Sequence, residues 1–273
     1  MRFWIVYYFI LEALRIGAKP WHFSQANVAF FDDEKGLFSK FQIEKLIPEK
    51  WRLESEVFRP GQVPGEFPVF LKPEWGQNSR GVFRADSDVD FTKIAGSIPG
   101  DKITYLVQRA AKGRKQLDVF YIRSTADPRT YGTISITECL SDGNEQCPIC
   151  GIYKGTWYSD VTEKFSKGDL ERIWENLETI GPFRIARVET KCDSYRDLVE
   201  GRFKIVEINI FLPMPMNVLD EEIPAKVRRA FVRKSMRLLA EQVKSISETR
   251  KPKNIFWRKV AAHFRLAGEI KKT

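Results

Sequence analysis

Short apolar runs separated by polar, glycine-containing segments are the main pattern along the middle of this chain. They are rich in β-branched and aromatic residues and are too short for buried helices, so they predict strands. The expected strands are Phe67–Lys72, Ile103–Gln108, Gln116–Ser124, Tyr131–Cys139, Phe183–Thr190 and Phe203–Leu212. Single helical segments separate them without a regular strand–helix alternation, which indicates an α+β fold with antiparallel sheets.

Apolar residues at helical spacing predict helices near both ends of the chain and between the strands. They are expected over Phe3–Ile16, Val89–Ile98, Leu170–Ile180, Val227–Ser247 and Ile255–Phe264. The first should stop at Gly17 and Pro20. A further helix should begin near Asp32 or Asp33, and Asp169 should cap the helix that follows it, because an aspartate side chain accepts hydrogen bonds from first-turn N–H groups.

Polar side chains interrupt the last two strands in a matched way. Arg187 and Glu189 lie two residues apart in one strand, and Glu207 and Asn209 lie two apart in the next. Alternate residues of a strand share a face, so the members of each pair should be about 7 Å apart on one side. If the strands return antiparallel, the four groups meet, and oxygen ligands beside an arginine suit Mg²⁺ and a phosphate group. The alternative is an edge strand with solvated polar side chains.

A lysine at a strand end and the loop after it have the composition of a phosphate site. Lys72 ends the strand that begins at Phe67, and Trp75–Gly81 contains two glycines and small polar residues. Backbone N–H groups and one ammonium group can hold phosphates, although the order differs from a P-loop because the lysine precedes the glycines. Farther on, the strand ending at Gln108 leads through Arg109–Lys115 into the next strand, a layout that resembles a hinge under an adenine ring.

In this order the three segments resemble the ATP-grasp superfamily, most closely its D-alanine:D-alanine ligase-like carboxylate-amine ligases. The resemblance covers Lys40 to Asp220 and lies in order and spacing more than in any single motif. It implies two antiparallel-sheet subdomains that clasp ATP, with a short helical N-terminal part and helices at the C-terminus. It also implies ATP and Mg²⁺, or Mn²⁺ in its place, as cofactors.

The functional positions of that family correspond to particular residues of this chain. The resemblance implies ATP contacts from Lys40 (with Lys45 as the weaker alternative), Lys72, Trp75, Gly76, Ser79, Gly81, Gln108, Gln116 and Asp118. Within this set, Gln108 would meet the adenine edge, and Gln116 or Asp118 would lie near the ribose. The implied metal ligands are Glu189, Glu207 and Asn209, and the implied catalytic residues, which steady the transferred phosphate, are Arg187 and Lys72.

The chain departs from the family pattern at three points. Glu189 stands where an aspartate is usual, and its longer side chain moves the carboxylate outward, which alters one metal ligand. Gln108 replaces a common glutamate, but an amide oxygen can still accept from the adenine amino group. Only 68 residues precede Val69, so the substrate-selecting domain that usually precedes the grasp is expected to be missing, reduced or supplied by another chain.

These inferences predict an ATP- and Mg²⁺-dependent ligase that joins a carboxylate to an amine through an acyl phosphate. Small-molecule or peptide substrates are expected, and nucleic acid is not. One alternative is an ATP-grasp phosphotransferase that stops at the phosphorylated product. The other is a nucleotide-binding module without turnover whose basic tail binds a membrane or an acidic polymer. Both histidines lie outside these motifs, which argues against a histidine base or a Ser-His-Asp triad.

Composition indicates an ordinary globular protein. The chain of 273 residues is 43% hydrophobic and 30% charged, which suits one large domain or two joined subdomains. Its four cysteines do not form the framework of a small secreted protein, so a reducing, cytoplasmic location is expected. Cys147 and Cys150 have the spacing of half a zinc site, for which only two cysteines and two histidines remain as partners.

Positive charge is concentrated at the C-terminal end. From Glu221 onward there are 15 Lys and Arg against 5 Asp and Glu, a net charge of +10, so the preceding 220 residues carry −1 of the total +9. The expected division is a helical segment at residues 1–60, a first ATP-grasp subdomain at 61–125, a second with the metal site at 126–220, and basic helices at 221–273.

Both ends of the chain combine apolar and basic residues. The run Phe3–Leu11 is too short to cross a bilayer and lacks a clean signal-peptide cleavage site, so it is expected to be a helix. The basic, aromatic segment Lys251–Thr273 suits either an anionic lipid surface or the protein body. We expect it to pack against the N-terminal helix, with peripheral membrane contact as the alternative.

Overall fold

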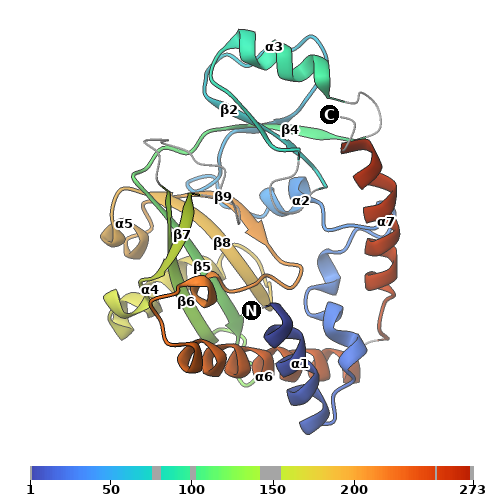
Figure 1. The fold of residues 1–273 in the computed structure, drawn as a ribbon, viewed down its shortest axis with the longest axis vertical. Coiled ribbons are helices and arrows are strands. Elements are labelled where there is room, and N and C mark those ends of the chain that lie inside the picture. Colours follow the sequence, from blue (N-terminus) through green and yellow to red (C-terminus); the bar gives the residue numbers. More distant parts are fainter. Residues whose placement is uncertain (1, 76–80, 99–102, 142–154, 250, 271–273) are drawn as a thin grey trace.

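Figure 1 shows the computed structural model, which describes residues 2–75, 81–98, 103–141, 155–249 and 251–270. Two sheets lie one above the other in this view, with helices below and to the right. The strands are β1 (Ser55–Val57), β2 (Val69–Pro73), β3 (Phe83–Ala85), β4 (Tyr105–Arg109), β5 (Lys115–Arg123), β6 (Tyr131–Ser141), β7 (Thr156–Asp160), β8 (Ile185–Cys192) and β9 (Lys204–Asn209). The α-helices are α1 (Arg2–Arg15), α2 (Lys40–Glu44), α3 (Asp88–Ser97), α4 (Lys167–Glu178), α5 (Tyr195–Val199), α6 (Ala225–Thr249) and α7 (Ile255–Ile270). Short 3₁₀ helices are η1 (Pro20–Gln25), η2 (Val28–Phe30), η4 (Thr162–Lys164) and η5 (Met216–Leu219).

Both sheets are antiparallel, which confirms the predicted α+β fold. The first has the strand order β1-β4-β2-β3, and the second has the order β7-β6-β5-β8-β9. The chain passes from one to the other between Arg109 and Lys115, so β5 belongs to the second sheet, although the predicted subdomain boundary was placed after it, at residue 125. The reason is the long pairing of β5 with both β6 and β8. The first sheet also begins earlier than predicted, at Ser55.

One face of the second sheet is apolar, and the opposite face is apolar at one end and polar at the other. Leu117, Val119 and Tyr121 alternate along β5 into a core that α4 covers. On the opposite face, Phe120 and Ile122 pack into a second core with α6. Polar residues of β5 occupy the same face nearer to the first sheet, because side chains of a strand alternate. The fold therefore leaves one end of this face uncovered by apolar packing.

Two predicted helix starts differ from the structure. The helix expected near Asp32 or Asp33 begins at Lys40 as α2, and Ser39 is its N-cap because its hydroxyl accepts from the Gln42 N–H at 3.3 Å. Asp33 instead forms ion pairs with basic residues of the C-terminal part. At α4 the N-cap is Ser166, and Asp169 completes a capping box by accepting from the Ser166 backbone N–H.

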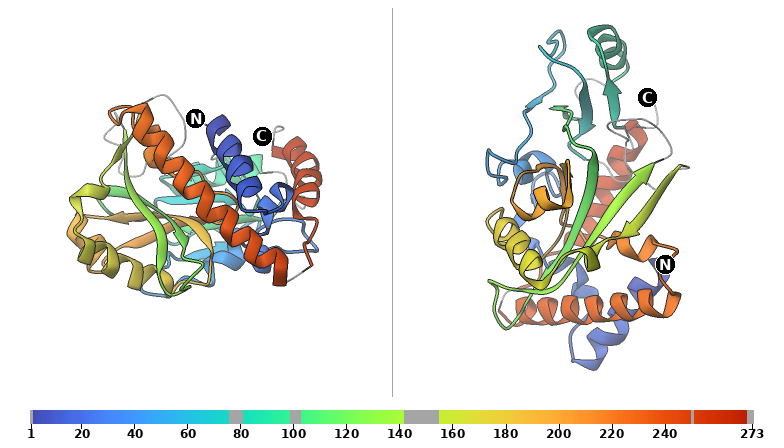
Figure 2. Two further views of the ribbon diagram at one scale, coloured as in Figure 1. Left: turned by 90° about the horizontal axis from the view of Figure 1, so that it is seen from below. Right: turned by 90° about the vertical axis from the view of Figure 1, so that its left-hand side faces the viewer.

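The helix α7 packs on the body of the protein, but its partner is not the one predicted. Its side chains contact Phe23, Asp33 and Trp75 through Phe256, Arg258 and His263, respectively. The helix α1 packs against α6 instead (Figure 2). The 25-residue helix α6 offers the longer buried apolar stripe, so it takes the contact that the sequence pattern assigned to the tail.

Two further expectations concern cysteines and membrane spans. Cys147 and Cys150 lie outside the described residues, whereas Cys139 and Cys192 are buried thiols. Within the described part of the chain, no helix combines the length and apolar character needed to span a bilayer.

Burial of Ile255 anchors α7, and its truncation should be costly. Ile255 is fully buried, so Ile255→Ala should lower the free energy of unfolding by about 2–4 kcal/mol. Phe264 lies on the same helix and is 76% exposed, so the control Phe264→Ala should change it by about 0.5 kcal/mol or less. Urea denaturation of both variants measures the difference, and equal losses would show that α7 is not held through Ile255.

Candidate active site

The hairpin of β8 and β9 brings together the four polar residues singled out above. Arg187 lies opposite Asn209, and Glu189 lies opposite Glu207. An Arg187 Nη2 to Glu189 Oε1 ion pair measures 2.6 Å, and Asn209 Nδ2 donates to the same carboxylate oxygen at 2.9 Å. The strand β9 is at the sheet edge, as the solvated-edge alternative requires, but its polar side chains are engaged with charged partners instead of facing only water.

A third carboxylate, Asp118, continues this row on β5. It lies opposite Glu189 in the register, and its Oδ2 is 3.7 Å from Arg187 Nε. Asp118 is buried, and its Oδ1 has no hydrogen-bond partner among the described residues. Burial, together with the negative charge of Glu189, raises the pKa of Asp118 to about 8. The residue expected beside a ribose thus lies next to the predicted metal ligands.

Two lysines from outside the hairpin approach the same row. Lys40, the first residue of α2, pairs with Glu207 at 3.2 Å. Lys72, near the end of β2, donates from Nζ to Gln108 Oε1 at 2.6 Å and to the Val206 carbonyl at 3.4 Å. Burial by itself raises the pKa of Glu207, but the two ammonium groups outweigh it and hold that pKa below its usual range. Burial lowers the pKa of Lys72.

The two lysine candidates upstream of β2 have different surroundings. Lys40 reaches the carboxylate row, whereas the Lys45 ammonium lies over the Phe41 ring, 4.3 Å from its centre. Only Lys40 therefore contacts one of the predicted metal ligands directly.

Gln108 and Gln116 occupy buried positions on either side of the connection between the sheets. The Gln108 amide accepts from Lys72 and donates from Nε2 to Glu44 Oε1 at 2.9 Å. To contact adenine, the Gln108 amide would have to give up its hydrogen bond to Lys72 or to Glu44. Gln116 precedes Asp118 by two residues, so both lie on one face of β5.

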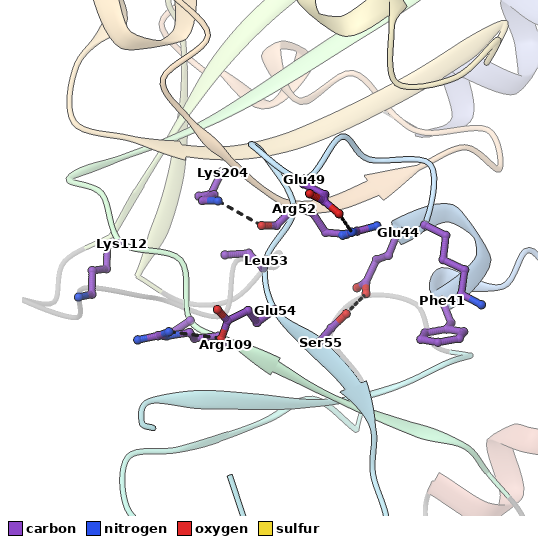
Figure 3. Close-up of a pocket in the computed structure, with 12 residues that line it drawn as sticks. Phe41, Glu44, Glu49, Arg52, Leu53, Glu54, Ser55, Arg109, Lys112 and Lys204 are labelled. Atoms are coloured by element: carbon purple, nitrogen blue, oxygen red, sulfur yellow. Dashed lines mark hydrogen bonds and ion pairs between the residues drawn. The ribbon is translucent and has the colours of Figure 1, made fainter. Parts of the chain in front are cut away.

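A cavity of about 760 Å³ lies beside the connection between the sheets (Figure 3). Its lining includes Arg109 and Lys112 of that connection and Lys204 of β9. Glu44 also lines it and accepts from Ser55 Oγ at 2.6 Å. Glu44 accepts from Gln108, and Gln108 accepts from Lys72, so a chain of hydrogen bonds leads from this cavity to Lys72 and the Val206 carbonyl of β9.

The predicted phosphate loop is described only at its two ends. Gly76 and Ser79 lie outside the described residues. Trp75 is buried, and its ring centroid is 5.2 Å from that of His263 on α7. Gly81 has a φ of 70°, a conformation that glycine adopts without strain.

Neither a protein-family model nor a curated protein matches the sequence of the chain. Several solved structures are similar to its fold. The ATP complex of D-alanine–D-alanine ligase from Bacillus anthracis matches with a TM-score of 0.51 and 11% identity, over 78% of this chain and 68% of that one. A second structure of that ligase matches with a TM-score of 0.50 and 11% identity, over 78% of this chain and 69% of that one. The chain has the ATP-grasp fold.

A longer solved protein, L-amino acid ligase from Bacillus licheniformis, matches with a TM-score of 0.49 and 12% identity over 76% of this chain. The match covers 47% of that protein, so this chain spans about half its length.

Lys259 is a basic residue near the site that sequence reasoning missed. It lies on α7, and its Nζ is 4.6 Å from the centre of the Phe211 ring, two residues beyond Asn209. Burial, with a smaller contribution from the charge of Lys40, lowers the pKa of Lys259 to about 8. In the sequence it is one of many tail lysines, so its proximity to the site depends on how α7 docks.

A pH-dependent effect on stability should follow from Lys259. Because its pKa is lower in the folded chain, the unfolded chain binds the extra proton between about pH 8 and about pH 10.5, and wild-type stability rises across that range. The Lys259→Met variant should lack this rise. The difference between its free energy of unfolding and that of wild type should therefore favour the variant most below about pH 8. Urea titrations at neutral and alkaline pH test this, with the exposed Lys234→Met as control. A pH-independent difference would contradict it.

The residues present fit a hard divalent cation bound together with phosphates. Glu189 and Glu207 supply carboxylates, and the Asn209 carbonyl oxygen remains an acceptor because its amide nitrogen donates to Glu189. In the described ranges no group of three or more His, Cys, Asp or Glu is placed to hold a metal ion. The predicted metal ligands therefore include the amide oxygen of Asn209 as the third. Arg187 and Lys40 now balance the two carboxylates.

Proposed function

We propose that this chain is an ATP- and Mg²⁺-dependent ligase that joins a carboxylate to an amine. The observation that carries the proposal is the row of Arg187, Glu189, Glu207 and Asn209, approached by Lys40 and Lys72, within an ATP-grasp fold. Two acids, an amide and several cations on adjoining elements are what a triphosphate with a divalent cation requires. The ATP-bound neighbour, a D-alanine–D-alanine ligase, supports the choice of nucleotide and of reaction class.

Each group has a proposed task in this reaction. Lys72 and the loop that starts at Trp75 would hold the phosphates of ATP, between the two sheets. Glu189, Glu207 and Asn209 would hold Mg²⁺, which when bound neutralises charge on the transferring phosphoryl group. Arg187 would stabilise the same group from the side, since its guanidinium is already oriented by two carboxylates.

The proposed reaction has two steps. An oxygen of the substrate carboxylate attacks the γ-phosphorus of ATP, the bond to the β-phosphate oxygen breaks, and ADP leaves behind an acyl phosphate. The amine then attacks the acyl carbon, the carbon–oxygen bond to phosphate breaks, and an amide and inorganic phosphate result. The nucleophile of the first step carries no proton, so the chain need not supply a strong base for it.

Release of phosphate from ATP tests this proposal. Purified protein would be incubated with ATP, Mg²⁺ and paired sets of carboxylates and amines, and phosphate release should require both members of a pair. With a carboxylate labelled by heavy oxygen, the label should appear in the released phosphate. Accumulation of a stable phosphorylated product without amine dependence would favour a phosphotransferase. ATP binding without turnover under all conditions would favour a binding module.

A further inference from the structure

The helix α1 carries an apolar stripe that nothing in the described structure covers. Five side chains on it recur at helical spacing and are between 43% and 72% exposed: Phe3, Val6, Tyr7, Ile10 and Leu14. The opposite side of the helix is packed, because Phe9 and Ala13 are buried against α6. Isolated exposed apolar residues are ordinary, but an ordered stripe on one helix marks an interaction surface.

Basic residues run beside this stripe along α6. Lys226, Arg229, Arg233 and Arg237 are all exposed and recur every three or four residues, so they form one row on that helix. The row adjoins α1: the Arg229 guanidinium is 4.7 Å from the Trp4 ring centre, and Arg233 Nε is 2.7 Å from Glu12 Oε1.

The carboxylates of this surface are paired with its basic residues, and on α6 Glu241 Oε1 lies 3.2 Å from Arg237 Nε. Glu12 is the only carboxylate of α1, it is 3% exposed, and Arg15 as well as Arg233 neutralises it. The surface therefore presents apolar side chains with positive charge alongside. If a second copy of the chain docked here, two of these basic rows would lie close together. Their repulsion, in a chain of net charge +9, opposes self-association.

We propose that α1 and the arginine row of α6 form a docking surface for an anionic lipid membrane. The stripe would enter the boundary between headgroups and acyl chains with α1 in the membrane plane, while the row pairs with lipid phosphates. Tyr7 and Trp21, which follows α1 and is 68% exposed, suit the headgroup level because their rings are both apolar and polar. This inference does not depend on the proposed ligase activity.

Co-sedimentation with vesicles tests the proposal. The full chain should pellet with vesicles of equal parts phosphatidylglycerol and phosphatidylcholine, and much less with phosphatidylcholine alone. Phe3→Gln with Ile10→Gln should weaken binding at least about tenfold, since two apolar anchors are lost. Lys226→Gln with Arg237→Gln should weaken it about fivefold per charge at low ionic strength, and added salt should remove that difference.

Matched control variants distinguish binding through this surface from nonspecific hydrophobic or electrostatic binding to the vesicles. Val89→Gln removes a side chain that is 73% exposed on α3, at the opposite end of the molecule in Figure 1, and should leave binding unchanged. Lys93→Gln with Lys167→Gln removes two exposed charges on α3 and α4 and should have little effect. Melting curves of all variants check that each is folded.

Three results would overturn the proposal. One is absence of wild-type binding to anionic vesicles at low salt. Another is binding that the α1 variant and its Val89→Gln control reduce equally. The third is a stable dimer in sedimentation velocity that the Phe3→Gln and Ile10→Gln changes abolish, because the occupant would then be a second copy of the chain.

Discussion

Glu207→Gln should reduce turnover by about a hundredfold or more, roughly 3 kcal/mol of transition-state stabilisation, while the protein stays folded. The substitution keeps the shape of the side chain but removes a carboxylate that Lys40 contacts at 3.2 Å and that belongs to the proposed metal ligands. ADP formation with saturating ATP and substrates measures the loss. A second readout needs no substrate: Mg²⁺ should raise the melting temperature of the ATP-analogue complex less in the variant than in wild type.

The matched control for that variant is Glu163→Gln, which makes the same chemical change at an exposed residue of η4. It should alter neither turnover nor the Mg²⁺ effect on melting. Unchanged turnover in folded Glu207→Gln protein would remove Glu207 from the metal site, and a large loss of stability would mean that the carboxylate mainly supports the fold.

Lys72→Met should weaken ATP binding by about tenfold to a hundredfold, because a charge-assisted contact to phosphate contributes about 1.5–3 kcal/mol. Lys72 is buried and donates to Gln108 and to the Val206 carbonyl, so its ammonium is held where β2 faces β9. Adenosine, which lacks phosphates, should bind the variant and the wild type equally well. Calorimetric titration of both ligands provides the comparison.

Stability gives an independent check on Lys72. Lys72→Met leaves Gln108 Oε1 without its donor, so it should lower the free energy of unfolding by about 1–3 kcal/mol. Burial, which lowers the pKa of this ammonium group, offsets part of that loss. Lys164→Met, on exposed η4, serves as the control for loss of one positive charge. If adenosine and ATP are weakened alike, Lys72 acts on the shape of the site and is not a phosphate ligand.

Local sequence patterns were enough to predict the strands and their polar residues. Alternation with a period of two placed Arg187 with Glu189 and Glu207 with Asn209, because the direction of a strand side chain depends only on its position along the strand. The antiparallel return of the two strands followed from the short polar connection between them. These are properties of neighbouring residues, and the structure has the six predicted strands with ends shifted by a few residues, whereas β1 and β7 were not predicted.

Contacts between distant segments could not be read from those patterns. The place of Asp118 beside Glu189 depends on the register of β5 against β8, which local sequence does not set. The choice between Lys40 and Lys45 depended on how α2 meets β9, and the position of Lys259 depended on where α7 docks. Likewise, α6 and not α7 covers α1, because burial of apolar stripes is decided by competition among all helices of the fold.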